Sequence, residues 1–262
     1  MSGAPEAPLT APRSRQPALR DAALRAWLRR AAACPEARGL VLRGSLLLDA
    51  LCPGARAPQD VDYLVPGAFD PAASERVARA VVAAGDPAGG PPLAFERVAI
   101  VFGETPWPGL RAFVRGGDET FQVDFASGDP LPEPPRPVDV PGAGPALACT
   151  AETLFGWKLH GLVEHGRGRW RPKDLFDLWL LGARLPLAPG PLRAAVDLAF
   201  SSRGLPLSAL DDLRTRPGWG QSRSGARAWR VFARRNPGAP EFLTAREAVR
   251  AAIEALYGPA AL

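Results

Sequence analysis

A segment rich in proline and glycine near the middle of the chain separates two halves with different hydrophobic patterns. It reads SGDPLPEPPRPVDVPGAGPA over residues 127–146, and so many turn-forming residues predict a connection without regular structure. Before it, apolar residues alternate with polar ones in short runs typical of strands, and after it they recur at helical intervals. We therefore expect an α/β (α+β) protein with a mobile N-terminus at 1–16, a mixed lobe at 17–146 and a helical lobe at 147–262.

The mixed lobe is expected to hold a small mixed sheet flanked by helices. Asp70 can cap a helix that has Pro71 at its first position. The glycines and aspartate at 116–118 separate two alternating runs, which predicts an antiparallel hairpin. The expected helices are 17–34, 46–51 and 70–85, and the expected strands are 39–42, 60–65, 93–102, 110–116 and 120–126.

The second half of the chain is expected to be mostly helical. A basic loop, GRGRWRP at 166–172, separates the first two of its helices. The expected helices are 150–165, 172–184, 191–200, 207–214, 224–235 and 244–257.

Composition excludes several classes of protein. No stretch reaches the roughly 18 apolar residues that a membrane-spanning helix needs, and the N-terminal residues lack the apolar core of a secretory signal. The cysteines, Cys34, Cys52 and Cys149, are odd in number and far apart, so they form neither a disulfide framework nor a zinc motif. We expect a reduced, cytoplasmic protein without a membrane partner.

The charge is distributed unevenly along the chain. Residues 39–150 carry eight arginines and fourteen acids, whereas residues 151–262 carry seventeen basic and ten acidic residues. An acidic lobe can hold cations, and a basic lobe can attract polyanions such as nucleic acid. Ordinary solvated surface is an equally good explanation of the charge taken by itself.

Two aspartates in one predicted strand are the strongest candidates for chemistry. Asp60 and Asp62 stand two residues apart, so their side chains project from one face of the strand. Asp124 lies on the polar side of a later strand, and the three carboxylates would converge if the two strands are neighbours. Carboxylates suit Mg²⁺, and a pair of ions can activate a hydroxyl and stabilise a leaving pyrophosphate. The alternative is that the acids simply face water at the end of a strand.

A glycine–serine pair precedes these acids. Gly44 permits a sharp turn, and Ser45 begins a short helix whose N-terminal amides favour a phosphate. The order of strand, Gly-Ser, short helix and Asp-x-Asp strand resembles the polymerase-β-like nucleotidyltransferase superfamily. That resemblance implies that Gly44 and Ser45 contact a nucleoside triphosphate (NTP) and that Asp60, Asp62 and Asp124 hold two Mg²⁺ ions. Fourteen residues separate Ser45 from Asp60, slightly more than is usual.

The downstream motifs narrow the resemblance. LVLRGSLLLDAL, RAPQDVDYLV, FQVDFASGDP and TAETLFGWKLHGLVEHGRGRWRPKDLFDLWLL occur in this order, with an arginine, Arg56, shortly before the Asp-x-Asp pair. The set resembles the nucleotidyltransferase toxins of the AbiEii/AbiGii type over roughly residues 20–257. One departure is Pro58, which stands where a serine or threonine is common.

The resemblance implies roles for residues of the second half. Thirty of the 32 basic residues are arginine, and the two lysines, Lys158 and Lys173, lie close together. Lys158 shares a helical stripe with leucines, where a buried ammonium needs a partner. The family implies that Lys158 binds the triphosphate and that Asp174 acts in or near the active site. Lys173 and the loop arginines could bind nucleotide or RNA phosphates. For Asp177, a favourable interaction with the helix dipole suffices to explain an acid near the start of the helix.

The expected activity is Mg²⁺-dependent transfer of a nucleoside monophosphate from an NTP to a hydroxyl. The resemblance implies a growth-inhibiting toxin of a toxin–antitoxin or phage-defence system, an RNA acceptor with the tRNA 3′ end as the leading candidate, and a separately encoded antitoxin. One rival is a nucleotidyltransferase for a small molecule such as an aminoglycoside. The other is a non-catalytic module that binds nucleotide or RNA. His160 and His165 have no cysteine partners, so no metal is expected there.

Overall fold

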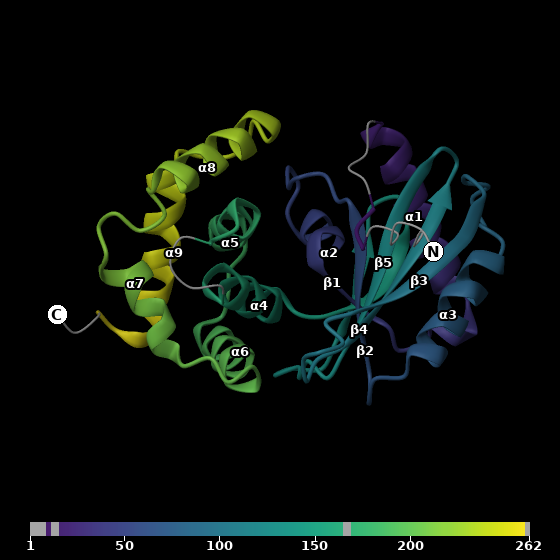
Figure 1. The fold of residues 1–262 in the computed structure, drawn as a ribbon, viewed down its shortest axis with the longest axis horizontal. Coiled ribbons are helices and arrows are strands. Elements are labelled where there is room, and N and C mark those ends of the chain that lie inside the picture. Colours follow the sequence, from purple (N-terminus) through teal and green to yellow (C-terminus); the bar gives the residue numbers. More distant parts are fainter. Residues whose placement is uncertain (1–8, 12–15, 165–168, 260–262) are drawn as a thin grey trace, which may run out of the picture. The chain divides into compact units, whose positions relative to one another are not determined.

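The computed structural model describes residues 9–11, 16–164 and 169–259, and these form two compact units (Figure 1). The sheet unit comprises Met1–Ala50, Ala57–Asp129 and Arg136–Ala148. The helical unit comprises Leu51–Arg56, Pro130–Pro135 and Cys149–Leu262. Each unit has its own hydrophobic core, and each is described separately below.

Within the described residues, seven strands of the sheet unit form one mixed sheet in the order β3-β4-β5-β2-β1-β7-β6. β2 pairs in parallel with β5, and β1 pairs in parallel with β7, while the other neighbours are antiparallel. The strands are β1 (Val41–Arg43), β2 (Asp60–Val65), β3 (Leu93–Val101), β4 (Gly109–Gly116), β5 (Glu119–Ser127), β6 (Arg136–Val140) and β7 (Gly144–Ala148). The expected mixed sheet is thereby confirmed.

Helices α1 (Pro17–Ala33) and α3 (Pro71–Ala83) cover one face of this sheet (Figure 1). Trp27 of α1 meets Phe121 of β5 edge to face, with ring centroids 6.3 Å apart. Phe121 belongs to the alternating set of β5 that is fully buried on this side. α3 begins as predicted, because the Asp70 carboxylate accepts a 2.8 Å hydrogen bond from the backbone N–H of Ala73. A short helix, α2 (Gly44–Leu51), follows β1.

The predicted hairpin is confirmed. β4 and β5 are antiparallel, and the register pairs Gly116 with Glu119 and Arg111 with Asp124. Gly117 lies in the turn with φ +61°, a backbone angle that glycine adopts without steric cost.

The prediction that residues 127–146 have no regular structure is wrong. β6 and most of β7 fall inside this segment and pair with each other at the end of the sheet. β6 carries Pro137 but is an edge strand, where a residue without an N–H interrupts no inner ladder. The abundance of proline therefore indicated an edge of the sheet and not the absence of a strand.

The helical unit follows the predicted pattern. α4 contacts both α5 and α6, and α5 also contacts α8 and α9. An aromatic cluster joins Trp170, Trp219, Trp229 and Phe242, with ring centroids 5.4–6.2 Å apart. The helices are α4 (Ala151–Val163), α5 (Pro172–Arg184), α6 (Pro189–Ser202), α7 (Asp211–Thr215), α8 (Arg223–Arg235) and α9 (Phe242–Tyr257), with short 3₁₀ helices at Leu207–Leu210 here and at Pro35–Ala37 in the sheet unit. No helix in the described part of the chain is both long and apolar enough to cross a membrane.

Candidate active site

The polar face of the sheet carries the three predicted carboxylates. β2 and β5 are adjacent and parallel, and their register places Asp62 directly beside Asp124, with Asp60 beside Gln122. Residues paired in this way point to the same side of a sheet, and neighbouring strands lie about 4.8 Å apart. Asp60, Asp62 and Asp124 therefore share one face, which is opposite to the face covered by α1 and α3. We call this the acid face.

The Gly44–Ser45 pair lies directly against the acids of β2. Gly44 has φ +73°, and a Cβ added there would lie 1.9 Å from Oδ2 of Asp62. The Ser45 side chain is buried, and its hydroxyl donates a 3.1 Å hydrogen bond to Oδ1 of Asp60. Only glycine lets the backbone approach Asp62 so closely, so the pair orients both carboxylates.

Arg111 of β4 places a positive charge on the acid face. Its Nε and Nη2 donate to the two carboxylate oxygens of Asp124 at 2.7 and 2.6 Å. A further Arg111 nitrogen donates to the carbonyl oxygen of Leu9 at 2.7 Å. Burial opposes the positive charge of Arg111, but Asp124, Asp60 and Asp62 together raise its pKa. One guanidinium thus interacts with all three acids.

The acids also influence one another. Burial raises the pKa of the Asp124 carboxyl above its ordinary value, and the nearby negative charge of Asp60 adds to this, whereas Arg111 and Arg43 lower it. Arg43 is opposite Asp62 in the sheet and forms an ion pair with Asp129. Like charges held this close favour a bound cation.

The side chains of the acid face are suitable ligands for a divalent cation, although they are not yet gathered around one point. Its carboxylate oxygens are the ligands that Mg²⁺ prefers, and the arginine already shows that one cation can interact with the whole set. Among the described residues, however, no group of three or more acidic, histidine or cysteine side chains is gathered closely enough to hold a metal ion as it stands. Asp60 already accepts a hydrogen bond from Ser45, and Asp124 would have to share its oxygens between the metal and Arg111.

A second cluster of charges lies in the helical unit, around Lys158 of α4. Asp177 of α5 is fully buried and accepts hydrogen bonds from Lys158 at 2.6 Å and from Arg56 at 2.9 and 3.0 Å. Asp174 lies 3.5 Å from the Lys158 ammonium and forms a 2.7 Å ion pair with Arg171. We call these five residues the lysine network.

The lysine network keeps its members charged. Burial would lower the pKa of Lys158, but Asp177 and Asp174 raise it above its ordinary value. Burial would likewise raise the pKa of Asp177, but Lys158 and Arg56 lower it. An ammonium has three N–H donors, and the two aspartates leave one of them for a further acceptor.

The remaining predicted residues of this half are placed differently. Lys173 is exposed in the first turn of α5, with no described interaction. Arg171 donates to Glu164 at 3.1 Å as well as pairing with Asp174, so its charge is already balanced by acids. His160 is buried beside Phe200, with ring centroids 5.5 Å apart. His165 and residues 166–168 of the basic loop lie outside the described residues.

The explanation of Asp177 by the helix dipole is wrong, because this residue lies beyond the first turn of α5 and is buried in an ion-pair network. Sequence reasoning gave no role to Arg111, and it noted Arg56 only as part of the family motif before Asp60. Arg111 could have been found from the hairpin, since the turn at Gly117 sets the register that places Arg111 opposite Asp124. No local signal links Arg56 to Asp177, which lies 121 residues away.

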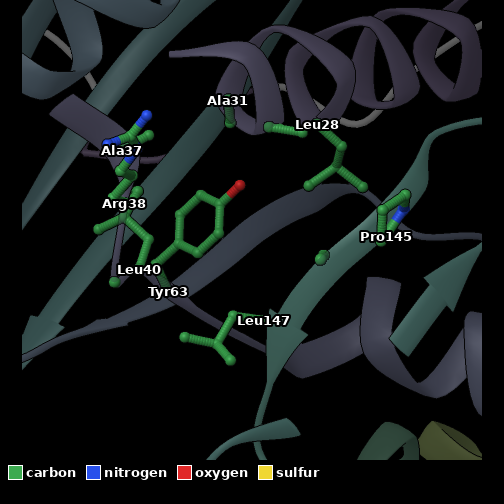
Figure 2. A pocket seen from close by; sticks show the side chains of 11 residues that line it. Leu28, Ala31, Ala37, Arg38, Leu40, Tyr63, Pro145 and Leu147 are labelled. Atoms are coloured by element: carbon green, nitrogen blue, oxygen red, sulfur yellow. The ribbon is translucent and has the colours of Figure 1, made fainter. Parts of the chain in front are cut away.

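A cavity in the sheet unit lies apart from these charges. It has a volume of ≈ 260 Å³ and an apolar lining that includes Tyr63 and, as its one charged residue, Arg38. Figure 2 shows the Tyr63 ring among Leu28, Leu40 and Leu147. Tyr63 and Asp62 are consecutive in β2 and point to opposite faces, so this cavity does not open onto the acid face.

Comparisons with known proteins match this chain to one family model and to solved structures. A family model described as nucleotidyl transferase AbiEii toxin of a type IV toxin–antitoxin system matches residues 25–255. A crystal structure of a protein assigned as a nucleotidyltransferase from H. pylori has a TM-score of 0.50 at 14% identity, covering 93% of this chain and 97% of that one. JHP933 from Helicobacter pylori has a TM-score of 0.49 at 16% identity, covering 94% and 95%. No curated protein matches. The first of the two structures supports the fold alone.

Proposed function

Because the chain belongs to the AbiEii family of nucleotidyltransferase toxins, we propose that it moves a nucleoside monophosphate from an NTP to a hydroxyl of RNA and releases pyrophosphate. Membership confirms the resemblance drawn from the motifs and with it the nucleotidyltransferase activity. The family description adds that the toxin–antitoxin system is of type IV, which implies a separate antitoxin. The tRNA 3′ end as acceptor, the use of Mg²⁺, a role in phage defence and a cytoplasmic location are parts of our proposal.

The observation that carries this proposal is the way Gly44 and Ser45 hold the paired acids of β2. The serine hydroxyl fixes Asp60, and the bare glycine backbone fixes Asp62. We propose that these two carboxylates, together with Asp124, bind Mg²⁺. When bound, Mg²⁺ makes the acceptor hydroxyl a better nucleophile and offsets charge on the leaving pyrophosphate. Gly44 and Ser45 begin α2, whose N-terminal amides suit a phosphate group.

The lysine network supports a role for Lys158 in handling phosphate. Asp177 and Asp174 keep its ammonium charged and hold it in place, which suits a group that must stabilise negative charge on a triphosphate. We propose that Lys158 donates its remaining N–H to the nucleotide and that Lys173 contributes a second positive charge. Asp174 and Asp177 would then act as positioning residues.

RNA is preferred over a cationic drug as the acceptor because of the charge of the chain. Residues 151–262 hold seventeen basic and ten acidic residues, which favours a polyanion and opposes an aminoglycoside. The same assay can test both acceptors, since only the second substrate needs to be exchanged.

The test is transfer of label from each of the four α-³²P-NTPs, with Mg²⁺, to total RNA, to purified tRNA or to an aminoglycoside. Asp62→Asn keeps the size of the side chain and removes its charge, and we expect transfer to fall by at least about 100-fold. The matched control is Asp118→Asn, which makes the same change at an exposed hairpin residue of the same unit.

Label in tRNA with the wild-type protein and the control, but not with Asp62→Asn, supports the proposal. Label in the drug and none in RNA would overturn the choice of acceptor. Absence of label from every acceptor with every NTP, for a protein shown to be folded, would overturn the proposed reaction itself.

A further inference from the structure

Helix α8 carries a row of arginines along one side. Arg223, Arg227, Arg230 and Arg234 follow one another at intervals of three or four residues, which places them within about 60° of one another around the helix. All four are exposed. At 1.5 Å per residue the row is about 16 Å long. We call it the arginine row.

The arginine row is not neutralised within the described chain. The sequence of α8, RSGARAWRVFARR, contains no acid, and among the described residues none of the four guanidiniums has an acidic partner. The contrast with α9 is clear, because there Arg246 and Arg250 form ion pairs with Glu247 and Glu254 at 2.5–2.6 Å. Exposed like charges at neighbouring turns of a helix repel each other, so the row costs stability unless a polyanion binds there.

The opposite side of α8 is fixed to the helical unit. Trp229 is buried and packs on Trp170 and Phe242, and Phe232 packs on Phe176. Ser222 caps the helix by accepting a 3.1 Å hydrogen bond from the N–H of Gly225. The apolar face is therefore occupied, which argues against α8 lying in a membrane surface, since that requires a free apolar face. The row therefore lies on the outer side of a helix whose inner side is packed.

We propose that the arginine row is a docking surface for the sugar–phosphate backbone of RNA. This inference rests on the proposed function, since it assigns a binding surface to the proposed RNA acceptor. Guanidinium groups bind phosphates through paired hydrogen bonds, and the spacing of one helical turn suits a ligand with regularly repeated charges better than a single phosphate. Contacts of this kind position a nucleic acid without reading its sequence.

The test is equilibrium binding of fluorescein-labelled bulk tRNA, without NTP, followed by anisotropy between 50 and 300 mM KCl. The variant replaces Arg227, Arg230 and Arg234 by glutamine. The control makes the same replacement at Arg115, Arg193 and Arg250, which have acidic partners; the first two are exposed and Arg250 is half-buried. Both triple variants lose three positive charges, so any difference in their tRNA affinity reflects where the replaced arginines lie. Binding of NTP is measured in parallel on each protein.

For the α8 variant we expect tRNA affinity to fall roughly 10- to 100-fold at 0.1 M salt, and the slope of log K against log salt to decrease by about 2–3. The control should stay within about threefold of wild type, and NTP binding should be unchanged in both. Equal losses in both triple variants would overturn the proposal, because the effect would then be one of net charge. Weak tRNA binding by the wild-type protein would also overturn the proposal. So would an α8 variant that binds tRNA with unchanged affinity but no longer binds an acidic protein antitoxin.

This experiment separates the two proposals. If the α8 variant loses tRNA affinity but the wild-type protein transfers no nucleotide to any RNA, the docking surface stands and the proposed reaction fails. If wild type labels tRNA and the α8 variant binds it with unchanged affinity and salt dependence, the reaction stands and the docking surface fails.

Discussion

Replacing Gly44 by alanine should damage the acid face more than any other single methyl group added to the sheet unit. The new Cβ would lie 1.9 Å from Oδ2, 2.6 Å from Cγ and 2.8 Å from Cβ of Asp62. A rotation of the Asp62 side chain can relieve the first two contacts but not the third, because Cβ is fixed to the backbone of β2. The strand itself would have to move.

The expected cost has two parts. At φ +73° a residue with a Cβ pays roughly 1–2 kcal/mol for the left-handed conformation. The collision adds an overpacking cost of about 1–3 kcal/mol. Gly117→Ala is the matched control, because Gly117 has φ +61° in the same unit and nothing lies within 4 Å of its added Cβ. The control pays the first cost alone.

Thermal unfolding and nucleotide transfer measure the two consequences. We expect Gly44→Ala to melt about 2–12 °C below Gly117→Ala, since 1 kcal/mol corresponds to about 2–4 °C at this size. We also expect transfer to fall by about 100-fold in Gly44→Ala, because displacement of a reacting group by about 1 Å costs that much. Equal melting temperatures for the two variants, with transfer retained, would refute the steric argument.

Three further outcomes follow from the charged residues. Asp177→Asn should lower the free energy of unfolding by about 3–5 kcal/mol, because it removes the buried carboxylate that both Lys158 and Arg56 contact. Asp211→Asn, at an exposed ion pair, should cost less than about 1 kcal/mol. Chemical denaturation of both variants measures the difference. The pKa of Asp177 is lowered in the folded state. The stabilising effect of its carboxylate is therefore complete above the pKa of the unfolded state, about 3.9, and is lost as the pH falls further. The difference in the free energy of unfolding between wild type and Asp177→Asn should narrow below about pH 4 and not at higher pH. Arg111→Gln removes the arginine that would share Asp124 with a bound metal, so Mg²⁺ should bind the variant more tightly and raise its melting temperature more than that of wild type. Binding at ten times the Kd stabilises a protein by about 1.4 kcal/mol. Arg115→Gln on the same strand should respond like wild type, and the absence of any Mg²⁺ response in Arg111→Gln would contradict the proposed Mg²⁺ site.

Much of the acid face follows from local rules. Two-residue alternation puts Asp60 and Asp62 on one side of a strand, and the glycine turn pairs Arg111 with Asp124. The pairing of β2 with β5 does not follow from such rules, because 53 residues and two other strands separate Val65 from Glu119. Only the family resemblance predicted that Asp62 and Asp124 would meet.

The errors have a common physical origin. Proline predicts a break in a strand because it lacks an N–H, yet β6 needs no hydrogen bond on its outer side. The helix dipole offers a local explanation for any acid near the start of a helix, and it therefore misleads at Asp177. Its true partners, Arg56 and Lys158, are brought to it by tertiary packing. Local patterns therefore describe strands and helices well but do not reveal partners that are distant in the sequence.

The lysine network also sets an order of events during synthesis. Arg56 belongs to the helical unit, although most residues of that unit lie in Cys149–Leu262. Asp177 lies 121 residues after Arg56 in the sequence. At 5–20 residues per second a ribosome needs about 6–24 s to make that stretch. During this interval the nascent chain holds Arg56 without its carboxylate, so the helical unit cannot mature before translation has passed α5. A fragment that starts at Cys149 would lack Arg56 altogether and should be a poor candidate for separate expression.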